Sequence, residues 1–354
     1  MSKQIKCLVW DLDNTIWNGT LAEAEPCRLR PGIRDVLRQL DSRGILMSIA
    51  SANDYTPVAT HLKKQNIWGY FTHPQINWDN KVHSLQTFAR HLDIALDTMA
   101  FIDDEPFELA QVEKLLPEVR TYQAQDYRRL PQLPEFNPPF LTDESRRRRI
   151  MYAGAEARKQ ARLAAGGNRM DFLKWTQTRL DLREAEDNDI PRIMELLNRT
   201  SQLNATGVVY DISEIKEFVH AGRYRVYIAA LKDRFVDYGI IGVAICRVDP
   251  PAWRLVSFLL SCRVLSRGIS AIFLNWVRNT ALRSGVNVME VYYKKRPRNR
   301  KMYMLFKMNG FRYTGKSRGG VSIYSQTRSM RAEYPDWLSV NSEICDGTVS
   351  NTPC

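Results

Sequence analysis

The feature that most constrains the fold is an apolar run near the start of the chain that ends in two aspartates. Residues 7–10 read CLVW, and Asp11 and Asp13 follow them. A short run of this kind is typical of a strand that is buried on both faces, as in a parallel sheet. At the carboxyl end of such a strand, where α/β folds place their ligands, two carboxylates make a site for a hard cation and a phosphate. Unpaired buried charge is costly, so packing alone does not explain the pair.

Length and composition set the broad class of protein. The chain has 354 residues, so two domains are expected, and its 44% hydrophobic and 25% charged residues match an ordinary globular protein. Its apolar runs fall far short of a membrane span, and no charged-then-apolar leader opens the sequence. The six cysteines show no CxxC spacing, which argues against zinc and against a disulfide framework. We therefore expect a cytoplasmic, reduced protein without a membrane segment.

The order of apolar runs predicts two unlike halves. Strand-like and helix-like segments alternate as far as Asp104, which indicates crossover connections and a parallel sheet. The proline-rich stretch 130–139 interrupts regular structure, and a charged helical segment follows it. Longer strand-like runs then mix with helices. The expected divisions are a first domain at 1–130, a joint and connector helix at 131–178, a second domain at 179–330 and a loose tail at 331–354.

Four polar elements of the first half fall at strand ends or helix starts. In chain order they are Asp11 with Asp13, Ser51, Lys81, and Asp103 with Asp104. Each alone has an ordinary explanation, since a DxD pair or a serine often caps a helix, a lysine is usually solvated, and paired aspartates often form a surface turn. All four together, in this order and these contexts, resemble the motifs of the haloacid dehalogenase (HAD) superfamily of aspartate-nucleophile phosphatases.

This resemblance implies a catalytic role for each element. Asp11 would attack phosphorus to form an aspartyl-phosphate, which divides one difficult displacement into two easier ones. Asp13 would protonate the leaving oxygen and then deprotonate the hydrolytic water. Ser51 and Lys81 would hold the non-bridging phosphoryl oxygens, where fixed donors and positive charge stabilise the transition state most.

The resemblance also implies a metal ion. Mg²⁺ would bind the Asp11 carboxylate, the main-chain carbonyl of Asp13 and the Asp104 carboxylate, with Asp103 in support, because an all-oxygen shell suits this ion. No long insertion separates the first two elements, so we expect no large cap domain over the site. Something else must then exclude water or supply specificity.

A narrower resemblance covers about residues 4–315 and points to the FkbH-like family of polyketide pathways, which joins a HAD domain to a domain like the GNAT class of N-acetyltransferases. The matching stretches are 11–19, 29–32, 43–54, 101–108, 199–204, 233–239 and 261–268. The fold class implied is α/β: a HAD-like Rossmannoid parallel sheet without a large cap, plus a GNAT-like α+β second domain. Better-known members take 1,3-bisphosphoglycerate, remove phosphate and deliver a glyceryl unit to an acyl carrier protein thiol. The match also implies substrate-binding roles for Asn14, Thr15 and Asn53.

In the second half the family's phosphate loop would fall at Arg263, Arg267 and Gly268, where a strand-like run meets a helix-like one. Free backbone N–H groups and the helix dipole favour a phosphate at such a junction. Ser266 replaces a glycine of the family pattern there, and Val236 replaces another, which weakens the expectation of tight coenzyme binding. A degenerate, scaffold-only second domain is the alternative.

A thiolate would be the natural acyl carrier if the transfer passes through the enzyme. Cys262 has the best position, at the mouth of the expected phosphate loop, although a buried structural role explains it equally well. Cys7 matches the family but lies about 13 Å from Asp11 along the same strand, so core packing is expected for it. Direct transfer to the carrier thiol stays open.

The net charge of +12 indicates an acidic partner. Residues 146–149 and 294–301 are basic, but no nucleic-acid recognition pattern accompanies them. We do not expect nucleic-acid binding, and we expect residues 294–301 to dock an acidic carrier protein. The function favoured is a glyceryltransferase/phosphatase acting on 1,3-bisphosphoglycerate and an acyl carrier protein. The alternatives are a Mg²⁺-dependent phosphatase of a small metabolite with an inert second domain, a binding module with a dead phosphatase fold, and a nucleic-acid end phosphatase.

Overall fold

The computed structural model describes residues 3–23, 27–261, 268–317, 319–327 and 334–342. The chain divides into two compact units, Met1–Ala153 and Gly154–Cys354. The division falls inside helix α6 (Arg148–Ala164), within the segment expected to be a connector. Residues 131–136, at the start of the expected joint, lie in the first unit, and Phe136 is fully buried in its core.

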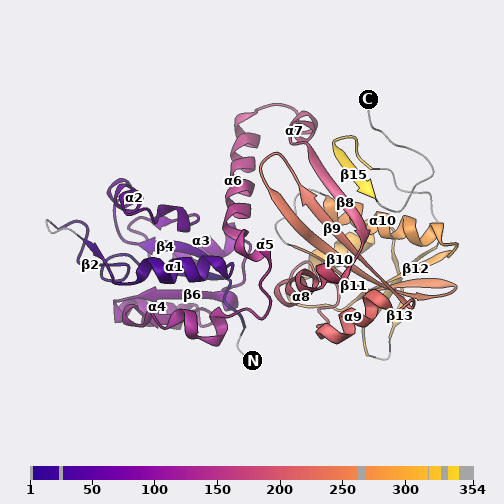
Figure 1. The fold of residues 1–354 in the computed structure, drawn as a ribbon, viewed down its shortest axis with the longest axis horizontal. Helices are drawn as coiled ribbons and strands as arrows, with labels where there is room; N and C mark the ends of the chain where they lie inside the picture. Colours follow the sequence, from indigo (N-terminus) through magenta and orange to yellow (C-terminus); the bar gives the residue numbers. More distant parts are fainter. Residues whose placement is uncertain (1–2, 24–26, 262–267, 318, 328–333, 343–354) are drawn as a thin grey trace. The chain divides into compact units, whose positions relative to one another are not determined.

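The first unit contains a parallel sheet of five strands in the order β5-β4-β1-β6-β7 (Figure 1). The strands are β1 (Cys7–Trp10), β4 (Leu46–Ser51), β5 (Gln75–Ile76), β6 (Met99–Asp103) and β7 (Arg120–Gln123). The first strand in the chain is thus the central one, and the chain extends the sheet on one side of β1 before it crosses to the other. Such a reversal of strand order is where open α/β sheets form their ligand sites.

Two helices cover each face of this sheet. They are α1 (Ile33–Ser42), α2 (Tyr55–Lys64), α3 (Lys81–His91) and α4 (Pro106–Leu115). Side chains of a strand alternate between its faces: Trp10 contributes to the core beneath α1 and α2, whereas Val9 contributes to the core beneath α3 and α4. All four residues of β1 are buried, as the apolar run at this position predicts.

No cap domain is inserted among the described residues between β1 and β4. A tight turn follows β1, and the short hairpin β2 (Trp17–Asn18) and β3 (Arg28–Leu29) precedes α1. In the turn, the backbone N–H groups of Thr15 and Ile16 both donate to the carbonyl of Leu12, at 3.1 and 2.8 Å. The expectation of a sheet without a large cap is confirmed for this part of the chain.

The second unit is built on a mixed sheet in the order β13-β14-β12-β11-β10-β9-β8-β15. Its strands are β8 (Thr178–Glu184), β9 (Tyr224–Lys232), β10 (Asp237–Asp249), β11 (Ala252–Leu260), β12 (Val288–Tyr293), β13 (Arg312–Lys316), β14 (Ser322–Thr327) and β15 (Leu338–Ser342). Neighbouring strands run antiparallel except for β11 with β12 and β15 with β8. The last of these strands lies in the segment expected to be loose, which lacks a clear apolar period because only Leu338 of β15 is buried.

Helices complete both units. The remaining ones are α5 (Asp143–Arg146), α7 (Arg169–Trp175), α8 (Ile190–Arg199), α9 (Ile212–His220), α10 (Ile269–Arg283) and α11 (Arg300–Met308). Short 3₁₀ turns join them at η1 (Trp68–Tyr70), η2 (Leu96–Thr98), η3 (Ala124–Asp126), η4 (Leu130–Gln132), η5 (Pro134–Phe136) and η6 (Asp187–Asp189). The proline-rich stretch therefore forms two single 3₁₀ turns, for which proline is suited because it lacks the N–H that the first turn leaves unpaired.

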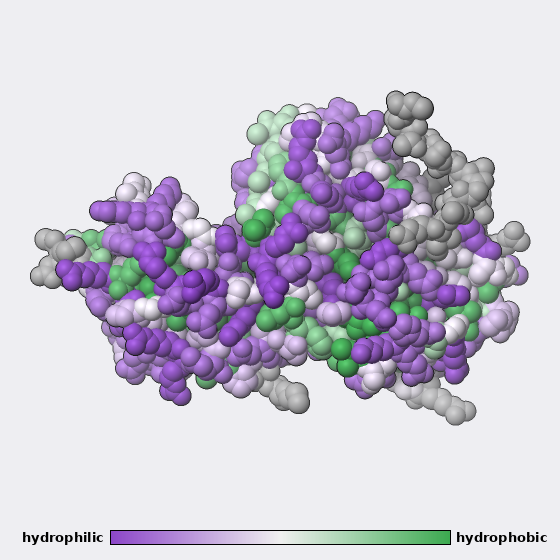
Figure 2. All heavy atoms as spheres, in the orientation of Figure 1, coloured by the Kyte–Doolittle hydropathy of each residue, from purple (hydrophilic) through white to green (hydrophobic). Residues whose placement is uncertain are grey.

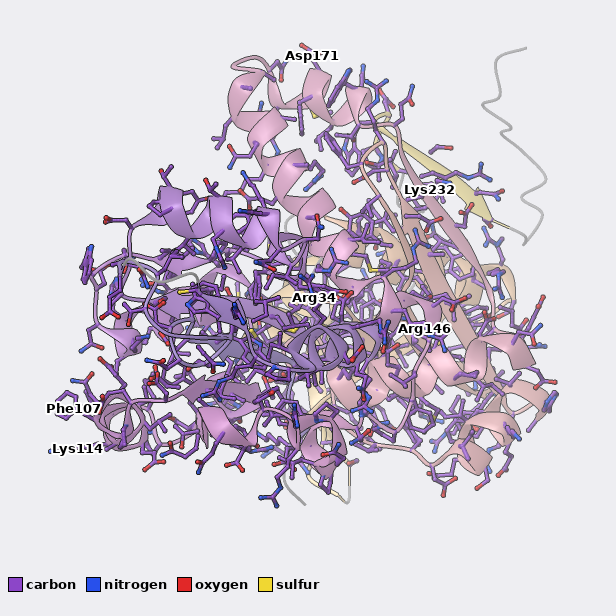
Figure 3. The ribbon with its side chains drawn as sticks, turned by 60° about the vertical axis from the view of Figure 1, so that its left-hand side comes forward. Arg34, Phe107, Lys114, Arg146, Asp171 and Lys232 are labelled. Carbon is purple, nitrogen blue, oxygen red and sulfur yellow. The ribbon has the colours of Figure 1, made fainter. Side chains whose placement is uncertain are left out.

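The surface has an ordinary polar character on the face drawn in Figure 2, where hydrophilic residues prevail and hydrophobic ones form small groups. Among the described residues, no helix is both long and apolar enough to cross a bilayer. Exposed apolar side chains occur at particular positions. Phe107, in the first turn of α4, is 69% exposed and points outward, as does Lys114 in the last turn (Figure 3).

Candidate active site

Three carboxylates and one ammonium group meet at the carboxyl edge of the first sheet. Ligand atoms of Asp11, Asp103 and Asp104 all lie within 4.8 Å of one another. Lys81 Nζ donates to Asp11 Oδ1, and it lies 3.3 Å from Asp103 Oδ2. Asp11, Lys81 and Asp103 are all buried, whereas Asp104 is partly accessible. The acidic residues predicted from separate stretches therefore form one cluster.

Strand register explains why the carboxylates meet. β1 and β6 are adjacent and parallel with Trp10 opposite Ile102, so the next residues, Asp11 and Asp103, lie side by side at the carboxyl edge of the sheet. The backbone N–H of Asp11 extends the ladder by donating to Ile102 O at 2.9 Å. Asp103 accepts from the backbone N–H of Glu105 at 2.9 Å, which fixes its carboxylate at the start of α4.

Lys81 reaches the cluster from the first turn of α3. Asn80 caps this helix by accepting from the backbone N–H of Val82 at 2.6 Å, so the helix begins at the lysine. Lys81 Nζ also donates to the carbonyl of Ala50 at 2.7 Å, at the end of β4. The ammonium group is therefore held between two strand ends, where it can face a phosphoryl group beside Asp11.

Burial and charge shift the ionisation of the cluster strongly. Burial raises the pKa of Asp11 to about 7, although the Lys81 ammonium acts to lower it and the other carboxylates add to the rise. Burial also raises the pKa of Asp103. Burial acts to lower the pKa of Lys81, but the two carboxylates outweigh it and raise the pKa. Like charges forced together in a buried place are a mark of functional sites, because a protein gains no stability from them.

The acidic cluster fits a hard divalent cation. Its donors are carboxylate oxygens from three side chains, the type of ligand that Mg²⁺ takes. Asp103 Oδ2 is buried and makes no hydrogen bond, with only the longer ion pair to Lys81 beside it. Such an under-satisfied buried oxygen is explained by a ligand that binds there. Asp11, Asp103 and Asp104 are thus the side chains that could hold the predicted magnesium ion.

Asp13, predicted to be the general acid and base, is fixed by three neutral donors. Its Oδ1 accepts from Trp17 Nε1 at 2.7 Å and from the backbone N–H of Leu21 at 3.0 Å. Its Oδ2 accepts from Asn53 Nδ2 at 2.8 Å. Asn53 Nδ2 also lies 3.2 Å from Ser51 Oγ, so the hydrogen-bonded group includes the serine predicted to hold phosphate. The predicted metal contact through the main-chain carbonyl of Asp13 stays a prediction.

The other predicted residues of the first half have unlike surroundings. Thr15 is fully buried, and its Oγ1 lies 3.4 Å from Asp104 Oδ1. Asn14 is exposed and has a positive φ of 50°, and its side-chain oxygen accepts from the backbone N–H of Gly19 at 2.9 Å. This bond joins the turn after β1 to the residue that follows β2, which gives Asn14 a structural role in the free protein.

Two donors to Asp13, the Trp17 indole and the backbone N–H of Leu21, are not among the site residues that the sequence predicts. A usable signal was the indole four residues after Asp13, in a segment too short for an independent element. A buried indole N–H needs an acceptor, and an aspartate at this spacing is the nearest one in sequence.

The acyl-transfer site predicted in the second unit lies largely outside the described residues. Cys262, Arg263, Ser266 and Arg267 all fall in the undescribed segment 262–267. Gly268 precedes α10 as its N-cap and has a φ of 71°, a conformation that suits glycine. Cys7 is fully buried, and burial raises the pKa of its thiol to about 12, which agrees with the core role expected for it.

A described feature of the second unit bears on the same question. β11 and β12 pair only from Ala252 to Leu255, and beyond this point their main-chain edges separate. Residues 203–205 fill the split: Ala205 N donates to Phe258 O at 2.9 Å, and Leu260 N donates to Leu203 O at 2.9 Å. On the other side, Lys294 N donates to Ala205 O at 3.0 Å. The chain itself thus occupies main-chain groups that an amide-bearing ligand could have used.

Asn299 holds residues 203–205 and the basic segment 294–301 together through hydrogen bonds of its side chain. It is fully buried, and its Nδ2 donates to Asn204 O at 3.0 Å and to Lys294 O at 2.9 Å. Its Oδ1 accepts from the backbone N–H of Arg296 at 2.9 Å and from Tyr293 Oη at 3.0 Å. The basic residues around it are exposed, so one buried amide holds a positively charged loop in a defined shape.

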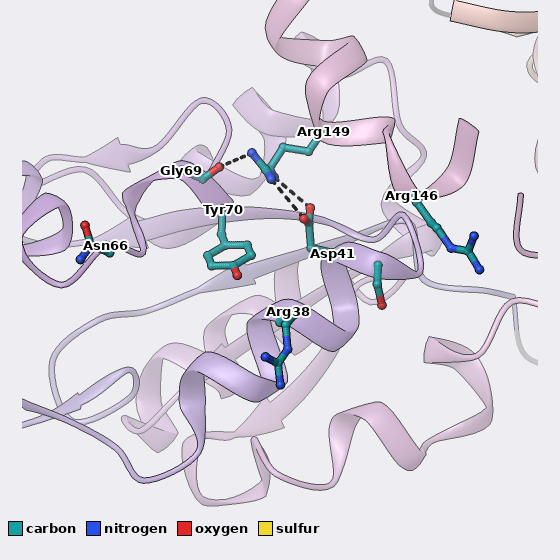
Figure 4. A pocket seen from close by; sticks show the side chains of 8 residues that line it. Arg38, Asp41, Asn66, Gly69, Tyr70, Arg146 and Arg149 are labelled. Carbon is teal, nitrogen blue, oxygen red and sulfur yellow. Dashed lines mark hydrogen bonds and ion pairs between the residues drawn. The ribbon is translucent and has the colours of Figure 1, made fainter. Parts of the chain in front are cut away.

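A separate pocket of about 450 Å³ lies on the first unit, lined by residues at the carboxyl end of α1, in the turns after α2 and at the start of α6 (Figure 4). Inside it, Arg149 forms an ion pair with Asp41, donates to Gly69 O at 2.7 Å and lies over the Tyr70 ring. One arginine of the basic run 146–149 therefore has a structural role, because it joins the start of α6 to α1.

Comparisons with known proteins give partial matches. No protein-family model matches the chain. Magnesium-dependent phosphatase 1 of Homo sapiens is 27% identical over 134 aligned residues, and the match covers 32% of this chain and 76% of that protein.

Two solved structures are similar in part. The N-terminal part of protein BF1531 from Bacteroides fragilis, which contains a phosphatase domain complexed with Mg, is 28% identical; the match covers 35% of this chain and only 38% of that one, with a TM-score of 0.33. The ribosomal-protein-S18-alanine N-acetyltransferase from Escherichia coli is 16% identical, with coverage of 44% and 97% and a TM-score of 0.34. The strand orders confirm the predicted α/β class, with a parallel sheet in the first unit and a mixed sheet with helices in the second.

Proposed function

We propose that the first unit is a Mg²⁺-dependent phosphatase that uses Asp11 as its nucleophile. The observation that carries this proposal is the buried cluster in which Asp11 contacts Lys81 and lies beside Asp103 and Asp104. A magnesium ion held by the three carboxylates would neutralise negative charge between the nucleophile and the phosphoryl oxygens. The similarity to human magnesium-dependent phosphatase 1 supports the same reaction class.

The residues divide the reaction into two balanced steps. An Asp11 oxygen attacks phosphorus, the bond from phosphorus to the leaving oxygen breaks, and that oxygen takes the proton of Asp13. Asp13 then removes a proton from water, which attacks the aspartyl-phosphate and releases phosphate with Asp11 restored. Lys81 stays in contact with the phosphoryl group throughout, since its ammonium lies between Asp11 and Asp103.

We further propose that the substrate is 1,3-bisphosphoglycerate and that the whole chain loads a glyceryl unit on an acyl carrier protein. A thiol sulfur attacks the acyl carbon, the bond to the anhydride oxygen breaks, and phosphate leaves; the first unit then hydrolyses the remaining phosphate ester. The sequence stretches shared with the FkbH-like family support this assignment. The exposed basic loop 294–301, held by Asn299, supports docking of an acidic carrier.

The test is intact-protein mass spectrometry of a phosphopantetheinylated carrier protein incubated with the enzyme, Mg²⁺ and 1,3-bisphosphoglycerate. A glyceryl adduct on the carrier supports both proposals. With Asp11→Asn, a phosphoglyceryl adduct is expected, because the thiol step does not need the aspartate. If Asp11→Asn abolishes all loading, the division of labour between the units is wrong.

A second candidate function is a phosphatase with a non-catalytic second unit, and one observation favours it. Residues 203–205 already pair with the edge of β11, so an amide-bearing pantetheine arm would have to compete for the main-chain groups of Phe258 and Leu260. In the same experiment this candidate gives free phosphate from a small phosphate ester without any adduct on the carrier.

A further inference from the structure

We propose that Trp17 is a positioning residue that fixes Asp13 for both of its proton transfers. The inference rests on the proposed phosphatase function and deepens it. Trp17 Nε1 donates to Asp13 Oδ1 at 2.7 Å, the shortest of the three hydrogen bonds that this carboxylate accepts from Trp17, Leu21 and Asn53. These donors come from three places in the chain, so the carboxylate is held on both of its oxygens.

Trp17 is itself rigidly placed. Its side chain is fully buried, and its backbone is paired with Leu29 in the β2–β3 hairpin. The indole meets the ring of His61 from α2 edge to face, with ring centroids 5.1 Å apart and an interplanar angle of 70°. Burial lowers the pKa of His61, so the ring behind the indole is an uncharged packing partner. The hairpin and α2 therefore set the position of the indole N–H.

This placement matters because Asp13 has two different partners in one cycle. It must reach the leaving oxygen as an acid and then the attacking water as a base, without moving onto Lys81 or the metal ligands. A reacting group that is displaced by about 1 Å can lose about 10²-fold in rate. The hairpin therefore performs part of the task that a cap domain would have, by holding the acid/base group rather than by covering it.

The leaving group separates a positioning role from a general loss of structure. In Trp17→Phe, formation of the aspartyl-phosphate from an alkyl phosphate should slow by about 10²-fold, because this leaving group needs a proton. Formation from p-nitrophenyl phosphate should slow little, because nitrophenolate leaves without one. Hydrolysis of the intermediate needs Asp13 as a base in both cases, so the nitrophenyl ester should give a burst of nitrophenolate followed by slow turnover.

Rapid-quench kinetics on the full chain, with Mg²⁺, measures both steps. Trp68→Phe is the matched control, a partly buried tryptophan that packs against the same core and is expected to show wild-type kinetics. If Trp17→Phe does not fold, Trp17 is replaced by benzothienylalanine, which keeps the shape of indole and has sulfur in place of the N–H. The expected burst must appear in that protein too.

The inference is overturned if the variant slows both leaving groups equally, or slows neither, while the wild-type protein turns over both substrates. A wild-type protein that hydrolyses no phosphate ester overturns the proposed phosphatase instead. The two failures are therefore distinguishable.

Discussion

One site in each unit shows how differently polar groups can be buried. In the first unit, Asp11, Asp103 and Lys81 bring buried charges together at one sheet edge. In the second unit, Asn299 is matched to main chain, at the carbonyls of Asn204 and Lys294. Matching stabilises a fold, whereas crowding like charges opposes it. The comparison teaches that the partners of a buried polar group indicate its role better than its burial does. Crowded charges indicate a candidate reactive site, whereas hydrogen bonds to main chain indicate a structural role.

The largest effect is expected from removal of the proposed nucleophile, Asp11, which would test this contrast most directly. Asp11→Asn should lower phosphatase kcat by about 10⁴-fold or more, as loss of a nucleophile does in well-studied hydrolases. The measurement is phosphate release under saturating Mg²⁺. Asp79→Asn, an exposed acid in the same region of the first unit, is the control and should keep its activity. Near-normal turnover by Asp11→Asn would show that the crowded carboxylates do not perform the reaction.

A smaller effect is expected from the cation in the cluster. Lys81→Met keeps most of the side-chain volume but removes the donor that faces Asp11, so kcat should fall by about 10²–10³-fold, the usual result of removing one oxyanion-stabilising donor. Lys114→Met, at the exposed end of α4, is the matched control. Equal kinetics of the two variants would mean that Lys81 only balances charge in the resting protein.

Replacement of Asn299 should lower the stability of the second unit without changing the phosphatase activity. Asn299→Ala leaves the carbonyls of Asn204 and Lys294 and the N–H of Arg296 without their partner, so the second unit should lose about 1–3 kcal/mol of unfolding free energy. Phosphatase activity should not change. Asn341→Ala, an exposed asparagine with one side-chain bond to Asp181, should shift stability by less than about 0.5 kcal/mol. A loss of phosphatase activity in Asn299→Ala would contradict the contrast between the units.

A last effect concerns how stability depends on pH and on magnesium. Asp11 has a folded pKa of about 7, above the value of about 3.9 for an unfolded aspartate. Its ionisation therefore opposes folding, with no effect below about pH 4, a growing effect up to pH 7 and the full effect above it. The melting temperature of metal-free protein should fall between pH 5 and 8, by about 2–4 °C for each kcal/mol.

Added Mg²⁺ should restore more of this stability at pH 8 than at pH 5, because the ion binds the ionised carboxylates. Thermal unfolding with Mg²⁺ and with a chelator measures the difference. The Asp11→Asn protein, which lacks the titrating group, should show a flatter dependence on pH. An equal Mg²⁺ effect at both pH values in the wild-type protein would contradict the assignment.

The sequence predicted the cluster of charged side chains in the first unit better than its surroundings. Asp11, Lys81 and Asp103 converge because each stands at the end of a strand or the start of a helix, and parallel strands bring such positions to one edge. The hydrogen bonds of Asp13 were not predictable in the same way. They depend on how the turn and hairpin after β1 fold back, and no side-chain period encodes that path.

The second unit shows the same limit. Its strands β9, β10 and β11 can be predicted from apolar runs in the sequence. The pairing of residues 203–205 with the edge of β11 cannot. That pairing uses main-chain groups between segments far apart in sequence, and all residues except proline carry the same main-chain donor and acceptor. Likewise, β15 has too few buried side chains to be recognised from its sequence.

The hydrogen bond from Trp17 to Asp13 also places an indole, a spectroscopic reporter, in contact with the proposed acid/base group. The indole nitrogen of Trp17 lies 2.7 Å from an oxygen of Asp13. If Trp17 is labelled with fluorine, we expect its ¹⁹F shift to change when this carboxylate gains or loses a proton. The chain contains eight tryptophans, so the labelled Trp17→Phe protein identifies the resonance by its disappearance. Each stage of turnover could then be followed by spectroscopy without adding a probe to the substrate.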